Sequence, residues 1–156
     1  MQIVVKINGL DEIKAMAKKY PEASLKHINW AIRRSIISIQ GDSIRNAPKD
    51  TGRLAGSMRA NFGDWWGSLT ADTEYAVPVH EGSVAHFPPV SALENWVRRK
   101  FGVSGRQARN LAFIIARKIS ISGTKGRPYM RNAVEQNENK IDADFNTALE
   151  NIVKSL

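Results

Sequence analysis

The chain has 156 residues, of which 42% are hydrophobic, so it can bury one core without disulfides or metals. It contains no cysteine, which excludes a disulfide framework, a zinc–thiolate site and a cysteine nucleophile. No stretch approaches the roughly 20 apolar residues of a membrane span, and the first residues are too polar for a signal peptide. We therefore expect a protein of the reducing cytosol that makes no membrane contact.

The net charge of +8 is concentrated in the middle of the chain. Residues 81–132 hold 10 basic and 2 acidic side chains, whereas residues 133–156 hold 2 basic and 5 acidic ones. Such a positive region attracts nucleic acid or an acidic protein, but it is equally typical of a solvated helix face. The basic patch comprises Arg98, Arg99, Lys100, Arg106, Arg109, Arg117 and Lys118.

The first half of the chain predicts a strand, two helices and a β-hairpin. Apolar residues alternate over residues 1–7, which predicts a strand with one apolar face. Helical spacing predicts a short helix over residues 10–20 and a second helix of about 25 residues that ends before Pro48. Two runs of period two, residues 57–62 and 68–73, flank a glycine-bounded connection and predict the hairpin.

The second half predicts a loop followed by three helices. Residues 82–90 include glycine and two prolines and predict the loop. A capping-box pattern over residues 91–94 predicts the start of one helix, and Ser104 gives a cap signal for the next. The residues of that next helix expected to face inward are Leu111, Ile115 and Ile119. Pro128 marks the start of the last helix.

Together these elements predict one α+β domain over residues 1–156, in which a small, mostly antiparallel sheet packs against several helices. No catalytic or metal-binding pattern emerges. His80-Glu81 resembles the start of a zinc-protease helix, but position 84 is Val where that pattern needs a second histidine. No Gly-x-Ser-x-Gly nucleophile elbow occurs either. We therefore expect no enzymatic activity, no cofactor and no metal.

Three short segments follow one another in a fixed order. The first segment, residues 47–58, contains Asp50, Thr51, Gly52, Arg53 and Leu54. The second segment, residues 74–83, contains Tyr75, Ala76, Glu81 and Gly82. The third segment, residues 123–133, contains Arg127, Pro128 and Tyr129. Together they resemble the tail-completion, or head–tail joining, proteins of the long-tailed bacteriophage neck, over roughly residues 10–150. The chain departs from that family by an inserted helical stretch at about 84–108.

The resemblance implies a structural virion protein without an active site. It implies a ring, commonly of six subunits, assembled in the host cytoplasm and placed between the connector under the portal and the top of the tail. The implied partners are further copies of the chain, the connector or head-completion protein, and the tail terminator or tail tube proteins. Transient contact with genomic DNA is a further implied interaction.

The residues of the first segment also have a structural interpretation. Asp50 or Thr51 can cap the turn that follows, and Gly52 permits a backbone geometry that a side chain would forbid. Leu54 is expected to anchor this turn to the core. A turn, a cap and a core contact therefore account for the segment without any chemistry.

The second and third segments can be interpreted in the same way. Glu81 is expected to accept backbone N–H bonds or to pair with an arginine such as Arg53. Pro128 fixes the start of the last helix, and Tyr129 is expected to pack near the sheet. A role at a subunit interface can coexist with each of these structural roles.

Two surfaces are candidates for contact with neighbours. Trp65 and Trp66 are adjacent, so at least one of them is expected to face solvent if the backbone is extended. Phe87 lies in the loop at residues 82–90. Exposed aromatic side chains are typical of protein interfaces.

The main alternative is a small nucleic-acid-binding module that uses the basic residues between 98 and 131. The two helices expected there could form a helix-turn-helix. Glycines at positions 102 and 105 lie in the inter-helix turn, but no polar recognition stripe is evident.

Overall fold

The computed structural model describes residues 2–3 and 10–155. Its helices are α1 (Leu10–Lys19), α2 (Pro21–Asn46), α3 (Arg53–Gly56), α4 (Ala76–Glu81), α5 (Val90–Phe101), α6 (Gly105–Ser122) and α7 (Tyr129–Lys154). Its strands are β1 (Gln2–Ile3), β2 (Met58–Gly63), β3 (Trp66–Ala71), β4 (Gly82–Ser83) and β5 (Thr124–Lys125). Of the strand predicted over residues 1–7, only β1 is described, and the remainder lies outside the described residues.

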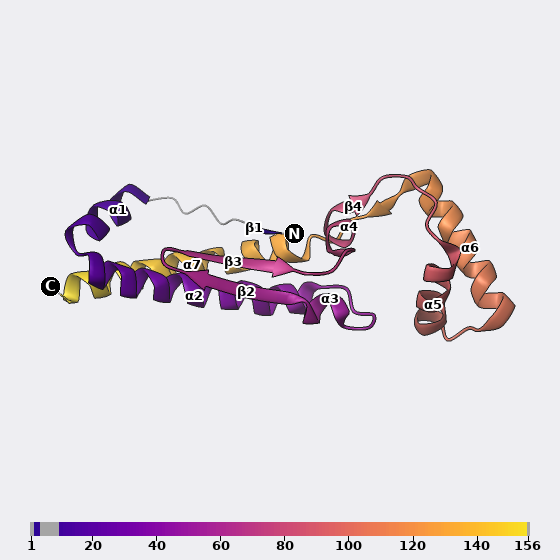
Figure 1. The fold of residues 1–156 in the computed structure, drawn as a ribbon, viewed down its shortest axis with the longest axis horizontal. Helices are drawn as coiled ribbons and strands as arrows, with labels where there is room; N and C mark the ends of the chain where they lie inside the picture. Colours follow the sequence, from indigo (N-terminus) through magenta and orange to yellow (C-terminus); the bar gives the residue numbers. More distant parts are fainter. Residues whose placement is uncertain (1, 4–9, 156) are drawn as a thin grey trace.

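The fold is α+β, as predicted, with antiparallel sheets and a large share of helix (Figure 1). The main sheet has the order β1-β3-β2, and the predicted hairpin of β2 and β3 pairs Met58 with Ala71 and Gly63 with Trp66. Alternation along these strands buries Met58, Leu69 and Ala71, which belong to the core beneath the sheet. None of the described helices combines the length and hydropathy needed to cross a bilayer.

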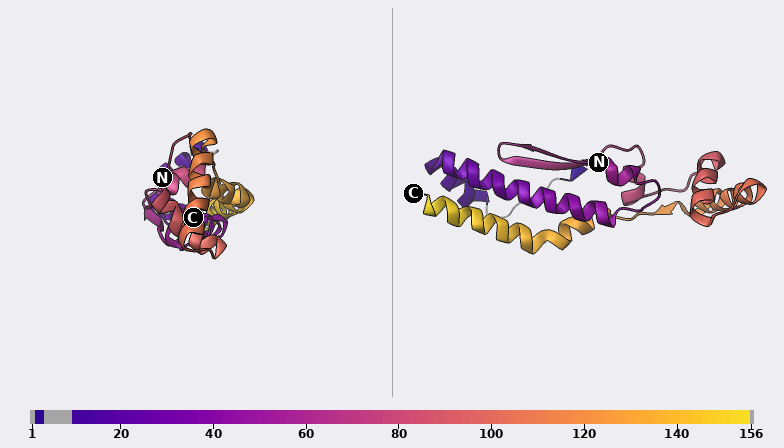
Figure 2. Two further views of the ribbon diagram at one scale, coloured as in Figure 1. Left: turned by 90° about the vertical axis from the view of Figure 1, so that its right-hand side faces the viewer. Right: turned by 90° about the horizontal axis from the view of Figure 1, so that it is seen from below.

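The long helices α2 and α7 run antiparallel, side by side, and the hairpin packs against α2 (Figures 1 and 2). The predicted apolar stripe of α2 faces this core, since Ile28, Ile32, Ile36 and Ile39 are buried. Polar side chains link the two helices along their length: Asn46 with Gln136, Asp42 with Asn137, Ser38 with Lys140, and Arg34 with Asp144. These partners run in opposite directions along the chain, so they fix the register of the two helices.

A helical arm projects from one end of this body (Figures 1 and 2). We define the arm as residues 84–122, which include α5 and α6 and extend past the stretch at about 84–108 expected as an insertion. The two-stranded ribbon of β4 and β5 connects it to the body, pairing Gly82 with Lys125 and Ser83 with Thr124. The ribbon was not predicted, because strands of two residues have no readable alternation.

The arm has a small core of its own, formed by Val97, Ala108 and Ala112. Leu111 and Ile115 pack against this core, as predicted, and are half-buried beside the fully buried alanines. Ile119, also expected to face inward, is half-buried but does not belong to this cluster. Alanine lets α5 and α6 approach closely, whereas larger side chains must sit at the flanks of the contact.

The predicted caps of the arm helices do not form. α5 begins at Val90 after Pro89, with no side-chain cap, and Glu94 pairs with Arg98 one turn later instead of returning to the helix start. Ser104 precedes α6 but makes no side-chain cap hydrogen bond. Proline, with its fixed φ, supplies the start of α5 in place of the capping box.

Candidate functional site

The second and third sequence segments form one junction between the body and the arm. The second segment forms α4 and β4, and the third forms β5 and the start of α7. The backbone N–H of Arg127 donates a hydrogen bond to the carbonyl of Val79, with 2.8 Å between N and O. Pro128 immediately precedes α7, as predicted. The two segments thus meet through backbone contacts as well as side chains.

Glycine permits this close approach of two backbones. A Cβ atom added at Gly126 would lie 2.4 Å from the carbonyl carbon of Glu81, and one added at Gly82 would lie 2.4 Å from the carbonyl oxygen of Thr124. Gly82 also has a φ of +91°, in the region that favours glycine. The glycines of these two segments are therefore required by packing at the junction.

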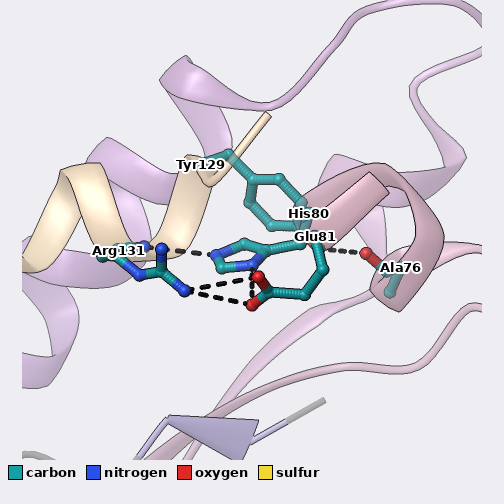
Figure 3. Close-up of polar contacts among 5 residues, drawn as sticks. All are labelled: Ala76, His80, Glu81, Tyr129 and Arg131. Carbon is teal, nitrogen blue, oxygen red and sulfur yellow. Dashed lines mark hydrogen bonds and ion pairs between the residues drawn. The ribbon is translucent and has the colours of Figure 1, made fainter. Parts of the chain in front are cut away.

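Four side chains fill the junction (Figure 3). His80 is 2% exposed, and its Nδ1 lies 2.8 Å from Oε1 of Glu81. The backbone N–H of Arg131 donates a hydrogen bond to Nε2 of His80 at 3.4 Å, which favours the His80 tautomer with the proton on Nδ1. The ring of Tyr129 lies edge-on to His80 with 5.1 Å between centroids, and its hydroxyl donates to the carbonyl of Ala76 at 3.4 Å.

Glu81 completes this group with an ion pair to Arg131, whose Nη2 lies 3.2 Å from Oε1. The hydrogen bond from His80 lowers the pKa of Glu81, and the charge of Arg131 acts in the same direction. Burial raises the pKa of Tyr129 to about 12. The expected pairing of Glu81 with an arginine is confirmed, but the start of α7 brings Arg131 to the carboxylate, and Arg53, the arginine suggested from the sequence, is exposed elsewhere.

Tyr129 lies in the core that also contains the sheet residues Met58, Leu69 and Ala71, as predicted. Its ring and hydroxyl contact α4, through His80 and Ala76. Ala76 is fully buried in the core shared by both segments, while the preceding Tyr75 is 37% exposed. The aromatic side chain therefore holds α4 against α7.

The first segment forms a turn that joins the same core. Leu54 is 4% exposed and lies in the core cluster that contains Ala76 and Tyr129. Gly52 has a φ of +79°, which confirms its predicted backbone role. Of the two residues expected to cap this turn, Thr51 does so through a long hydrogen bond, since its hydroxyl accepts from the N–H of Arg53 at 3.4 Å. Gly52, the N-cap residue of α3, has no side chain to add a cap.

Asp50 binds the arm instead of capping the turn. Its two carboxylate oxygens accept hydrogen bonds from Nε and Nη2 of Arg99, at 2.9 and 2.7 Å. These hydrogen bonds and the charge of Arg99 lower the pKa of Asp50. The first segment is thus connected to α5, and all three segments lie where the arm leaves the body.

No family model, curated protein or solved structure matches this chain.

The chemistry of the junction is that of ion pairs and packing. Among residues 2–3 and 10–155, no three histidine, cysteine, aspartate or glutamate side chains gather where they could hold a metal ion. His80 is enclosed by its partners, His86 is exposed and bonds to the carbonyl of Val84, and His27 lies on α2. The three histidines of the sequence thus belong to separate parts of the molecule.

Both tryptophans of the hairpin connection are exposed, Trp65 by 42% and Trp66 by 52%. The prediction that at least one of them faces solvent is confirmed, although the backbone here is not extended: Trp65 has a φ of +68° in the tight turn, and Trp66 is the first residue of β3. The side chain of Asn29 accepts a hydrogen bond from the N–H of Trp65 at 2.8 Å, which holds this turn to α2. The hairpin tip is therefore a fixed, aromatic surface.

The arm carries a second exposed apolar surface. Phe87, predicted as an interface residue, is 54% exposed and lies edge-on to Phe113, with 6.1 Å between ring centroids. Phe113, Ile114 and Ile121 on α6 are also exposed and were not singled out from the sequence. The signal was present, since α6 has large apolar residues on every side and only one side can face α5.

The basic patch spreads over both helices of the arm. Arg98 and Arg99 are engaged by Glu94 and Asp50, respectively. The remaining members, Lys100, Arg106, Arg109, Arg117 and Lys118, are exposed, and none has an ion pair within the described part of the chain. The positive charge of the α6 surface is therefore available to a partner.

Proposed function

We propose that this chain is a structural subunit of the bacteriophage neck, which forms a ring and joins the DNA-filled head to the tail during virion assembly. The observation that carries the proposal is the convergence of the three segments on which the family resemblance rests. They are distant in the sequence, yet they make one junction through Leu54, Tyr129 and the pair of Glu81 with Arg131. Three segments that form one structural unit support the family resemblance more specifically than three unconnected sequence matches would.

The properties of the junction suit a structural element better than a reactive site. Its ionisable groups are paired with one another: Glu81 with Arg131, His80 with Glu81, and Asp50 with Arg99. Backbones in van der Waals contact, as at Gly126, cannot open to admit a substrate without disrupting the ribbon. These contacts set the position of the arm relative to the body.

The exposed apolar side chains support a role in assembly. Trp65 and Trp66 form one surface at the hairpin tip, and Phe87 with Phe113 forms another on the arm. Large exposed aromatic residues are typical anchors of protein interfaces. Two such surfaces at distant places would allow one subunit to contact two neighbours, as a ring between head and tail requires.

The test is to inactivate the gene in the phage that encodes it and to image the lysate by electron microscopy. We expect packaged heads and finished tails that remain separate, and a supplied wild-type chain should restore joining in proportion to its amount. Trp66→Ala should complement poorly, whereas Trp30→Ala, which truncates a tryptophan of similar exposure on α2, should complement well. Joined virions in the lysate without the protein would refute the proposal, and empty heads would indicate a packaging role.

A second candidate function is nucleic-acid binding by the arm, favoured by the exposed and unpaired side chains of Arg106, Arg109 and Arg117. Contacts with phosphates make affinity fall steeply with salt concentration. Duplex binding that weakens with salt and is lost on Arg109→Ala would favour this function. Heads and tails that join normally without the protein would favour it as well.

A further inference from the structure

The outer surface of α6 combines positive charge with large apolar side chains. Phe113, Ile114 and Ile121 are 52%, 63% and 74% exposed. Arg106 lies seven residues before Phe113, and Arg117 lies four residues after it. Both spacings place the arginines on the same side of the helix as Phe113. We call these five residues the outer α6 surface. The opposite side of the helix is its alanine face against α5.

One side of α7 carries the opposite charge. Glu135, Glu138 and Asp142 are exposed, and their spacing of three and four residues places them on one side of the helix. Each lies two positions before a residue that bonds to α2, namely Asn137, Lys140 and Asp144. Two positions correspond to about 200° around a helix, so the acidic side of α7 points away from α2. No ion pair engages these three carboxylates in the described part of the chain.

These two surfaces cannot meet within one molecule. The arm projects from the end of the body at which α7 begins, and α7 runs away from it toward the opposite end (Figure 1). Asp50 and Arg99 hold the base of the arm in this position. Contact between the two surfaces therefore requires two copies of the chain.

We infer that the outer α6 surface of one copy docks on the acidic side of α7 of a second copy. The contact is heterologous, because each copy gives its arm to one neighbour and its α7 to another, so repetition closes a ring if the rotation allows. Arg106 and Arg117 would face Glu135, Glu138 and Asp142, while the apolar residues of α6 are removed from water. The inference deepens and rests on the proposed function, since it supplies the contact between ring subunits.

The composition of the outer α6 surface favours a protein over a nucleic acid. Phosphate contacts use hydrogen-bond donors, and large aliphatic side chains in the middle of the surface add nothing to them. Arginine beside aromatic and aliphatic residues is instead the composition of a protein interface. The acidic side of α7 supplies the complementary charge on the same chain.

Charge reversal on each side separately, followed by mixing, tests the contact. Arg106→Glu with Arg117→Glu makes the arm acidic, and Glu138→Lys with Asp142→Lys makes α7 basic. We expect each variant alone to self-associate at least about tenfold more weakly than wild type, because like charges then face one another. The equimolar mixture should recover association, since each copy now meets an opposite charge. Sedimentation equilibrium measures this, and Lys26→Glu with Lys49→Glu is the control of equal charge change at exposed sites.

The absence of native cysteine allows a second, geometric measurement. Asn110→Cys on α6 and Asn139→Cys on α7 are exposed single-cysteine variants. Under mild oxidation their mixture should form a disulfide-linked dimer faster than either variant alone. Asn61→Cys on β2, mixed with Asn110→Cys, is the control and should stay uncross-linked.

Several results would overturn the inference. One is a wild-type protein that remains monomeric at every concentration tested. Others are charge-reversal variants that self-associate as tightly as wild type, or an equimolar mixture of the variants that does not recover association. If Arg106→Glu with Arg117→Glu abolished binding to duplex DNA, and the mixture did not recover self-association, the outer α6 surface would be assigned to DNA. None of these results would remove the proposed neck function, which the joining of heads and tails tests independently.

Discussion

The body and the arm bury their apolar residues very differently. The body has one continuous core, to which α2, α7, the sheet, α3 and α4 all contribute. The separate cluster of the arm has three buried members, Val97, Ala108 and Ala112, and the arm leaves large apolar side chains on its surface. Buried apolar area is the main favourable term in folding, so the body is the stable unit and the arm depends on its attachments. Both regions still offer apolar surface to a partner, the hairpin tip on the body and the outer surface of α6 on the arm.

The largest expected effect separates the two cores. Leu54→Asp places a charge among the buried residues of the body and should reduce the free energy of unfolding by about 3–5 kcal/mol. Val97→Asp makes the same type of change in the arm and should open the arm while the unfolding of the body changes by less than about 1 kcal/mol. Urea unfolding with amide hydrogen exchange measures both.

Leu54→Met controls for the position itself, since a volume-conserving change should cost less than about 1.5 kcal/mol. If Val97→Asp reduced the stability of the body as much as Leu54→Asp, the two regions would unfold as one cooperative unit. The body and the arm would then differ in shape but not in stability.

The second prediction concerns the junction between the regions. Gly126→Ala puts a Cβ atom 2.4 Å from the backbone of Glu81, so the ribbon must shift. We expect a loss of about 2–4 kcal/mol in unfolding free energy, together with weaker hydrogen-exchange protection of β4 and β5. Gly56→Ala is the matched control, because open space surrounds that position, and it should be neutral or stabilising by less than about 1 kcal/mol. Equal effects of the two substitutions would show that the ribbon is not tightly packed.

Much of the fold was predictable because its signals are local. The hairpin, the α2 stripe, the turn at Gly52 and the start of α7 after Pro128 each follow from periodicity or from one residue with a special backbone preference. The arm was less predictable. Its second helix is apolar on several sides, and periodicity cannot decide which side faces a partner helix within the same chain and which faces solvent.

The residues that form the junction were predicted better than the contacts between them. Leu54, Glu81 and Tyr129 were all singled out, and an arginine was expected to pair with Glu81, but that arginine is Arg131 and not the suggested Arg53. Partners of this kind depend on how distant elements pack, which a single sequence does not encode in any local pattern. The same holds for Asp50, whose short side chain suits a cap equally well but is bound by Arg99.

The smallest expected effect, and the one that bears most directly on how the regions are joined, comes from Arg99→Ala. Hydrogen bonds and charge from Arg99 lower the pKa of Asp50 below its ordinary value of 3.8. A carboxyl group whose folded-state pKa is lowered stabilises the folded state above its ordinary pKa, and this stabilisation is lost as the pH falls through the lowered value. The attachment of the arm should therefore weaken only in acid, below about pH 4.

In Arg99→Ala the pKa of Asp50 should rise toward 3.8, as followed by NMR titration of its carboxyl carbon. Because the pair is largely exposed, the midpoint of unfolding should hardly move, whereas relaxation measurements should show a more mobile arm. Arg98→Ala removes the pair with Glu94 inside the arm and should leave both the pKa of Asp50 and the motion of the arm unchanged. A pKa of Asp50 that stays low in Arg99→Ala would mean that another group holds the carboxylate. Lys100, the next residue of α5, is the first candidate, because its charge also lowers the pKa of Asp50.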